Sequence, residues 1–145
     1  MTGPRTLTVE GPDAHGRKLF IGIPYESSYT FSTFAIREGD SKGNAVTTGR
    51  LQLRRLTLNC SNTGFLHMHV TPKFRPTSTY TFTGRELGHG TNIIGAIPLY
   101  TGTINFPILS LNTQVEVKVG SDSFLPFALV NASWEGFYNT RNARV

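Results

Sequence analysis

The segment RLQLRRLTLNC, residues 50–60, alternates apolar and polar side chains as a β-strand with one buried face does. Leu51 and Leu53 share one face, whereas the three apolar residues after the arginines fall on positions of the opposite parity. One residue inserted at Arg54–Arg55, as in a β-bulge, would bring all five apolar side chains to the same face and turn both arginines outward. The segment is therefore predicted to form a long, bulged strand, the strongest in the chain.

The same period of two recurs along most of the sequence, and helical spacing is hard to find over any long window. The segment SNTG at 61–64 is expected to be a tight turn, after which residues 65–72 run back as the partner of strand 50–60. A change of face within residues 26–36 predicts a bend near Ser32–Thr33. In the last strand, Trp134 is expected on the same face as Ala128, Val130 and Ala132. The expected strands are residues 17–24, 26–36, 50–60, 65–72, 78–84, 101–109, 113–120 and 127–138.

Length and composition agree with a single loop-rich domain. The chain has 145 residues, 38% of them hydrophobic, with 15 glycines and 8 prolines that favour frequent turns. We predict an all-β fold: an antiparallel β-sandwich or barrel-like module of about eight strands with long loops. Residues 1–16 are expected to be an extended N-terminal arm, and residues 17–145 a single module. The sequence has no run of about 18 apolar residues, so no membrane-spanning helix is expected.

Charge is unevenly distributed along the chain. The net charge is +5, and seven of the basic residues fall between Ser41 and Arg85, a span without any aspartate or glutamate. This basic span is predicted to present a positive surface. It is expected to be a solvated face or to contact an acidic protein neighbour, and direct contact with nucleic acid is the alternative. The candidate interface residues in this span are Arg50, Arg54, Arg55, Lys73, Arg75 and Arg85.

Signatures of catalysis are weak. His67 and His69 share a strand face, but a zinc site needs three or four ligands and no third one stands at a telling spacing. The lone Cys60 is expected to be buried and inert, and the carboxylates form no acid–base pair. Tyr29, Phe31, Tyr80 and Phe82 alternate with serine and threonine, which is typical of a core face rather than of a base-stacking platform. No catalytic residue, metal or cofactor is predicted.

Three stretches in order then carry a resemblance. They are LFIGIPYESSYTFSTFAIRE (19–38), TGRLQLRRLTLNCSNTGFLHMHVTP (48–72) and INFPILSLNTQVEVKVGSDSFLPFALVNASWEGFYNTRNARV (104–145). Together they resemble the C-terminal region of tail tubular protein B, the nozzle protein of short-tailed, podovirus-type bacteriophages. Members of that family run to several hundred residues. We therefore expect this chain to be a fragment, a split-gene product or a small relative that keeps one module.

The resemblance implies a structural role in the virion. Family members form a ring, expected to be hexameric, below the adaptor and portal, and the genome leaves through it. The implied partners are further copies of the chain, the adaptor, other tail proteins and tail fibres, with DNA passing transiently and without sequence-specific binding. The implied location is the virion tail, assembled in the host cytoplasm. The resemblance makes Trp134, Glu135, Gly136 and Tyr138 structural anchors of the last strand and adds Arg141 and Arg144 to the interface residues.

A second interpretation belongs to another class of protein. The chain could be a free β-sandwich binding module for glycan or for nucleic acid. Glycan binding needs an exposed aromatic platform, and the single tryptophan is expected to point inward. Nucleic-acid binding through the basic span would fall steeply as salt is raised.

Overall fold

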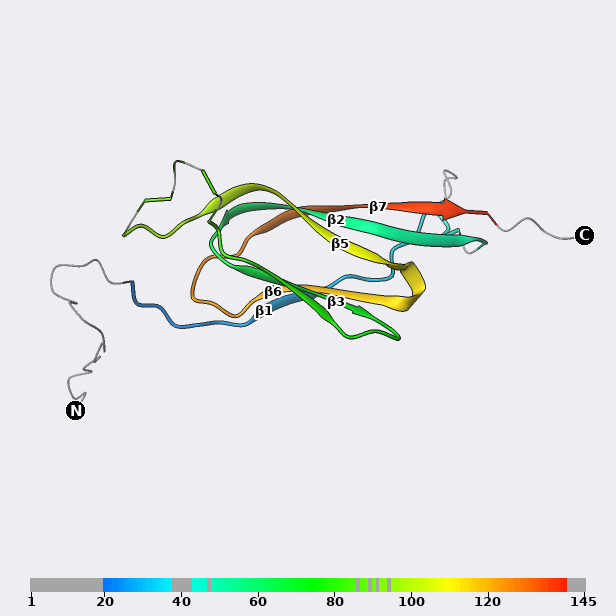
Figure 1. Ribbon diagram of the computed structural model, residues 1–145, viewed down its shortest axis with the longest axis horizontal. Coiled ribbons are helices and arrows are strands. Elements are labelled where there is room, and N and C mark those ends of the chain that lie inside the picture. The colour runs from blue at the N-terminus through cyan, green and yellow to red at the C-terminus, as the bar shows by residue number, and fades with distance from the viewer. Residues whose placement is uncertain are drawn as a thin grey trace, which may run out of the picture.

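The structure, a computed structural model, describes residues 20–37, 43–46, 48–85, 87–88, 90, 92–93 and 95–140. The proposed arm at 1–16 lies outside these residues. In the described part, seven strands and one 3-10 turn form two layers (Figure 1). The elements are β1 (Ser27–Thr30), β2 (Arg50–Thr63), β3 (Leu66–Pro72), β4 (Ser78–Phe82), β5 (Tyr100–Leu111), η1 (Asn112–Gln114), β6 (Val115–Ser121) and β7 (Leu129–Asn139).

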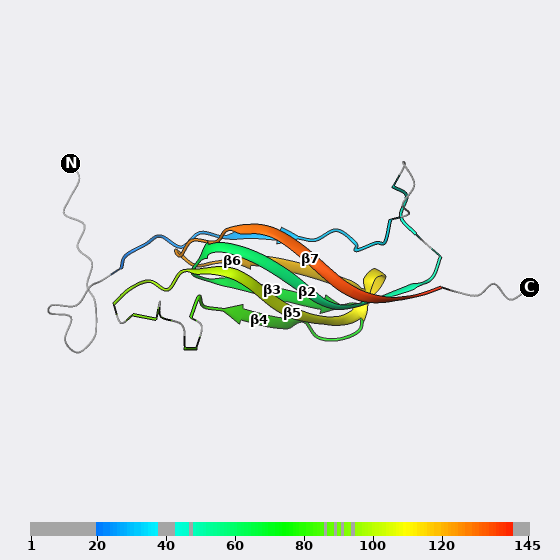
Figure 2. The same cartoon turned by 90° about the horizontal axis from the view of Figure 1, so that it is seen from above.

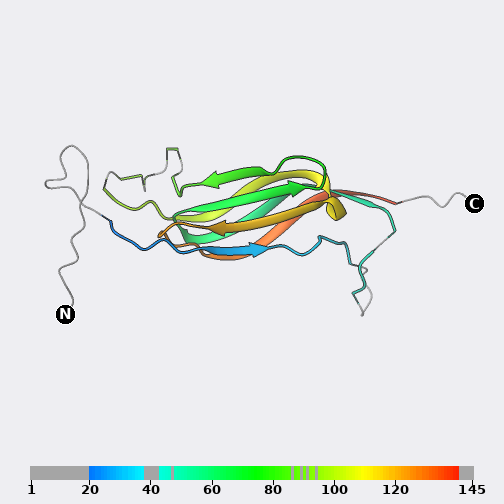
Figure 3. The same ribbon diagram turned by 90° about the horizontal axis from the view of Figure 1, so that it is seen from below.

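Both sheets are antiparallel. One has four strands in the order β1-β6-β3-β4, seen from below in Figure 3, and the other has three in the order β5-β2-β7, seen from above in Figure 2. Neither sheet closes on itself, so the predicted all-β sandwich is confirmed and the barrel alternative is wrong. Only β3 and β4 are both consecutive and paired. All other consecutive strands lie in different sheets, so each of their connections crosses from one layer to the other and links the two layers.

The bulge predicted at Arg54–Arg55 is confirmed. The pairing of β2 with both β5 and β7 shifts register between Leu53 and Arg55. The four leucines and Cys60 of β2 are all at most 5% exposed, and both arginines point outward. Because β2 is the central strand of its sheet and is paired on both edges, this buried row forms the floor of the core.

The hairpin predicted at residues 61–64 is wrong. β2 runs on to Thr63, and β3 pairs with β4 and β6 in the opposite sheet. A second register shift between Cys60 and Thr63, with Asn62 at φ 46°, turns the end of β2 toward the other layer. Alternation shows which face of a strand is buried but not which strand lies beside it. A sheet-crossing corner and a hairpin therefore leave the same pattern in the sequence.

The N-terminal strands are shorter than predicted. Residues 20–26 belong to no strand, and β1 covers only residues 27–30 of the predicted strand 26–36. After β1 the chain bends, and the Phe31 and Phe34 rings stack at a centroid distance of 5.8 Å. Phe34 is buried against the core although it lies outside the regular strands. The change of face predicted near Ser32–Thr33 thus marks the end of the strand.

The last strand also departs from its expected pattern. β7 shifts register against β2 between Asn59 and Cys60, so that Leu129 pairs with Cys60 and Asn131 with Asn59. Val130 is therefore the extra residue and is 65% exposed, contrary to the prediction that it shares the inner face with Trp134. Trp134 itself is half-buried and packs on the core.

The core lies between the two sheets. The remaining strands contribute as their alternation predicts, with Val117 and Val119 from β6 and Phe106 and Ile108 from β5 buried. The buried apolar residues are Phe34, Leu51, Leu53, Leu56, Leu58, Cys60, Leu66, Met68, Val70, Phe106, Ile108, Val117 and Val119.

Candidate interface surfaces

The structure divides the basic span among three places. Arg54 and Arg55 lie on the outer face of the three-stranded sheet. Arg85 lies at the end of the sandwich where β4 finishes, beside a hollow partly lined by Ile93 and Pro98. The other three candidates in the described chain gather at the opposite end. The predicted interface residues Arg141 and Arg144 lie outside the described residues.

The gathered residues, Arg50, Lys73 and Arg75, line a cleft of about 280 Å³, which we call the basic cleft. No aspartate or glutamate is among its described lining residues. Arg75 is held in place because its Nη2 donates to the Leu109 carbonyl and to the Ser110 hydroxyl, each at 3.2 Å. Three cations without a nearby acid form a surface that suits a carboxylate or a phosphate.

An exposed aromatic ring stands at the rim of the basic cleft. Phe74 is 80% exposed, and the Lys73 ammonium lies 5.7 Å from the centroid of its ring. A large apolar side chain held beside cations at a turn is typical of a protein contact surface. Lys73 and Arg75 were predicted from the sequence and Phe74 was not, although a single aromatic residue between two basic ones marks it.

On the outer face of the three-stranded sheet, the two arginines have partners within the chain. Arg55 Nε lies 2.6 Å from Glu135 Oε2, and the Arg54 guanidinium lies 5.2 Å from the centroid of the Phe137 ring. Beyond them the face is a polar ladder, in which Asn59 accepts from Thr103 at 2.6 Å and donates to Asn131 at 2.6 Å. These arginines are therefore positioned by β7 and are less available than those of the basic cleft.

The predicted anchors of β7 occupy its inner and outer faces in turn. Trp134 and Tyr138 are half-buried and pack on the core, and the Tyr138 hydroxyl donates to the Thr48 carbonyl. Gly136 stands opposite the β2 bulge, where an added Cβ would lie 2.6 Å from the Gln52 carbonyl oxygen. Glu135 points outward to Arg55. Their role as structural anchors of the last strand stays a prediction.

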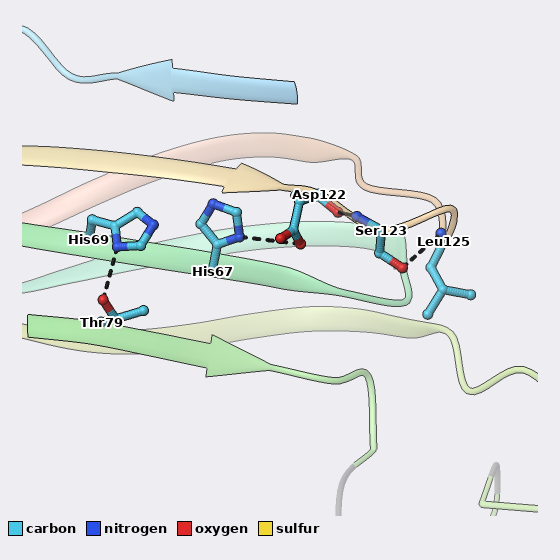
Figure 4. Close-up of polar contacts among 7 residues, drawn as sticks. His67, His69, Thr79, Asp122, Ser123 and Leu125 are labelled. Atoms are coloured by element: carbon cyan, nitrogen blue, oxygen red, sulfur yellow. Dashed lines mark hydrogen bonds and ion pairs between the residues drawn. The ribbon is translucent and has the colours of Figure 1, made fainter. Parts of the chain in front are cut away.

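The outer face of the four-stranded sheet carries the histidine pair (Figure 4). The rings of His67 and His69 lie 4.7 Å apart, His69 Nδ1 is 3.0 Å from the Thr79 hydroxyl, and His67 Nδ1 is 3.8 Å from Asp122. Burial, followed by the charge of His69, lowers the pKa of His67. Within the described ranges no three histidine, cysteine, aspartate or glutamate side chains gather as a metal site would need.

Cys60 is buried, as predicted. It is 3% exposed, and burial raises the pKa of its thiol. A thiol in this setting is a weak nucleophile.

One feature of the surface was missed altogether. A hollow of about 250 Å³, which we call the edge hollow, lies between the 31–37 segment and the neighbouring Ala132 and Trp134 of β7, with Leu56 also among its lining residues. It lies beside a strand that has a partner on one side only. No sequence signal marks it, because alternation does not show whether a strand is central or at an edge.

No helix in the described part of the chain is long and apolar enough to cross a membrane.

Comparison with known proteins identifies the group to which this module belongs. The chain is 33% identical over 132 residues to the tail tubular protein gp12 of Escherichia phage T7. The matched part is 90% of this chain and 16% of that protein, so the chain spans a small share of its relative. The family model described as bacteriophage nozzle protein matches residues 1–145, which confirms the nozzle family named by the resemblance. The finer match, to the C-terminal region of tail tubular protein B, stays a prediction. The chain therefore belongs to the bacteriophage nozzle protein family.

Proposed function

We propose that this chain is a structural component of the tail nozzle of a short-tailed phage. It forms part of a ring, docks on adaptor and other tail proteins, and surrounds the DNA during ejection without catalysing a reaction. The observation that carries the proposal is the match of the nozzle family model along all 145 residues. The name of the T7 relative, a tail tubular protein, supports the same assignment.

A sandwich whose sheets do not close has strand edges to which other subunits can bind. Several large apolar side chains of the described residues are exposed, among them Phe74, Phe137 and Ile23. Scattered apolar residues are normal on a surface, but Phe74 and Phe137 stand next to the cations Lys73 and Arg54, in a setting typical of protein contact surfaces. In a ring, each copy would make a head-to-tail contact that uses two different surfaces of the molecule.

The basic cleft is best explained as a protein contact. A surface that gripped many phosphates would slow the DNA, because each neutralised phosphate adds to binding. A small cleft with three cations and an exposed phenylalanine instead fits an acidic, partly apolar segment of a neighbouring tail protein.

The first test reverses charge in the basic cleft. Arg50→Glu with Lys73→Glu, introduced into the phage, should prevent incorporation of the chain into tails, because both side chains would then repel an acidic partner. Lys118→Glu, on β6 of the four-stranded sheet and not among the residues that line the basic cleft, is the control and should leave tails normal. Electron micrographs of particles from the infected cells provide the measurement. Normal tails with the double variant would contradict the docking role of the cleft.

A second variant tests the outer face. Arg54→Glu with Arg55→Glu should block tail assembly rather than DNA binding. Because Arg55 pairs with Glu135, Arg55→Glu combined with Glu135→Arg keeps an internal pair of reversed polarity. If the swapped pair restores tails, the arginine acts within the chain, whereas continued failure indicates an intermolecular contact.

The alternative function, a free binding module for nucleic acid, is favoured only by the lack of aspartate and glutamate among the described residues that line the basic cleft. A gel-shift series at two salt concentrations separates it from the nozzle role. Binding that falls steeply with salt and is lost in the Arg50→Glu/Lys73→Glu variant would support it.

A further inference from the structure

We propose that residues 20–25 of one copy add as an extra strand to the free edge of β7 in a neighbouring copy. The apolar side chains of the incoming segment would fill the edge hollow. This inference rests on the proposed ring and names the two surfaces that join its subunits.

β7 is an unprotected edge. It has 11 residues, contains no proline, and within the described residues its backbone hydrogen-bonds only to β2. The other three sheet edges are protected against pairing with another chain. β1 and β4 are short, with 4 and 5 residues, and β5 carries Pro107 and a positive φ at Leu109. A long unprotected edge invites pairing with another strand, so natural proteins cover it.

The edge hollow gives this edge a specificity pocket. It lies between β7 and the segment after β1, and its lining combines the aromatic rings of Phe31, Phe34 and Trp134 with the polar side chains of Ser32, Thr33 and Arg37. In strand addition, backbone hydrogen bonds supply affinity and pockets for alternate side chains supply specificity. An incoming strand with apolar residues two positions apart matches this arrangement.

Residues 20–25 have the matching properties. Phe20, Ile21 and Ile23 are 46%, 70% and 88% exposed, and the segment belongs to no strand. Ile21 and Ile23 are two positions apart, so in a strand they would share one face. Apolar alternation predicts a strand here, and none of the strands formed by the described residues pairs with it. Pro24 ends the stretch that can pair, since it has no backbone N–H.

The segment does not reach β7 of its own chain. The Tyr25 hydroxyl donates to the Leu125 carbonyl at 3.0 Å, and Gly22 packs so closely on Phe124 that a Cβ would lie 2.5 Å from its ring. From these contacts the segment extends away from the sheets at one end of the sandwich (Figure 1), whereas the edge hollow lies along β7 at Ala132 and Trp134. The donor and acceptor surfaces thus differ, and such head-to-tail contacts close into a ring when the rotation between copies allows it.

Disulfide trapping in assembled tails tests the contact. Phage that encode Ile23→Cys together with Ala132→Cys are purified and oxidised, and their tail proteins are separated without reductant. Neighbouring copies should join into a ladder of covalent multimers, because every copy carries both a donor and an acceptor cysteine. The buried Cys60 should not react. The control, Ile23→Cys with Thr79→Cys on β4 of the other sheet, should remain monomeric.

Other gel patterns contradict the proposal. Dimers alone would indicate a two-fold contact, and monomers alone would indicate that residue 23 does not lie beside β7 of a neighbour. If the chain is present in these particles but forms no ladder, strand addition fails while the nozzle function stands. If the chain is absent from the particles, the nozzle function itself fails.

Disruption of the donor provides a second, independent measure. Ile21→Asp with Ile23→Asp should weaken self-association of the full chain by at least about tenfold, since two buried isoleucines would be replaced by carboxylates. Leu87→Asp, at a side chain with full exposure in a loop, is the matched control and should have little effect. Sedimentation velocity over a concentration series measures the difference. Equal effects of the two changes would contradict the role of the segment.

Discussion

β2 and β7 are neighbours in one sheet and share the same alternation, yet they differ in what holds them. β2 is paired on both edges and buries Leu51, Leu53, Leu56, Leu58, Cys60 and Thr63, whereas no residue of β7 is fully buried. β2 is thus held by the interior of its own module. Within the described part of the chain β7 pairs on one side only, and we propose that its other side receives a strand from a neighbouring copy. Four changes to the molecule should show how far this contrast holds, and the largest effect is expected in the core.

The largest effect is expected from a cavity under β2. Leu56→Ala should lower the free energy of unfolding by about 2–5 kcal/mol, because a fully buried leucine is truncated in a packed core. Val130→Ala, at the exposed extra residue of β7, should change it by less than about 0.5 kcal/mol. Urea unfolding of both variants measures the difference, and similar losses would refute the contrast.

A smaller effect is expected where the two strands meet. Gly136→Ala should cost about 1–3 kcal/mol, because its Cβ would lie 2.6 Å from the Gln52 carbonyl and the strands would have to move apart. Gly90→Ala, which has open space around it, is the control. Thermal unfolding compares the two, and an unchanged Gly136→Ala variant would show that β7 adjusts freely.

The ion pair across the same strands should matter less. Arg55 and Glu135 are both more than half exposed, so their coupling should be only about 0.2–1 kcal/mol and should decrease in high salt. A double-mutant cycle with Arg55→Ala and Glu135→Ala measures it. A coupling of several kcal/mol would mean that β7 is held to β2 by charge rather than by its inner face.

The smallest effect lies on the other sheet and depends on pH. Burial lowers the pKa of His67 below its unfolded value of about 6.5, so between the two pKa values the unfolded state binds more protons. Stability should therefore decrease slightly as pH falls through about 6.5 toward the lower, folded pKa. Asp122 and Glu26 oppose this shift, and Lys118 adds to it. His67→Asn should remove part of the decrease, and melting curves between pH 7 and pH 5 measure it.

The sequence predicted the inner surface of the fold well. A change of parity at two adjacent arginines was enough to locate the β2 bulge, because only a bulge reconciles five apolar residues with one buried face. The alternation of Val117 and Val119, and of Phe106 and Ile108, correctly predicted buried faces for the same reason.

The pairing of strands could not be predicted from the sequence. Residues 65–72 were expected beside β2 and lie in the opposite sheet, since alternation carries no information on which edge a strand meets. The 17–24 prediction failed in a similar way: an apolar extended segment was identified, but the described residues provide no strand for it. Both errors concern partners rather than faces, and the second is the basis for the proposed contact between copies.

The candidate surfaces show the same division. Seven basic residues without an acid predicted a positive surface, but only the fold brings Arg50 beside Lys73 and Arg75 and directs Arg55 to Glu135. The edge hollow depends on a bend, an edge strand and a tryptophan from distant parts of the chain. Residues of such a surface come together only when the chain is folded, so their spacing in the sequence does not mark them.

Quantitative mass spectrometry of purified virions tests the central claim, that this chain is a subunit of the tail nozzle. The account predicts that peptides from the chain are present at the copy number of a hexameric ring, which is half that of a dodecameric portal in the same particles. Absence of these peptides from virions that contain normal amounts of portal would contradict the account.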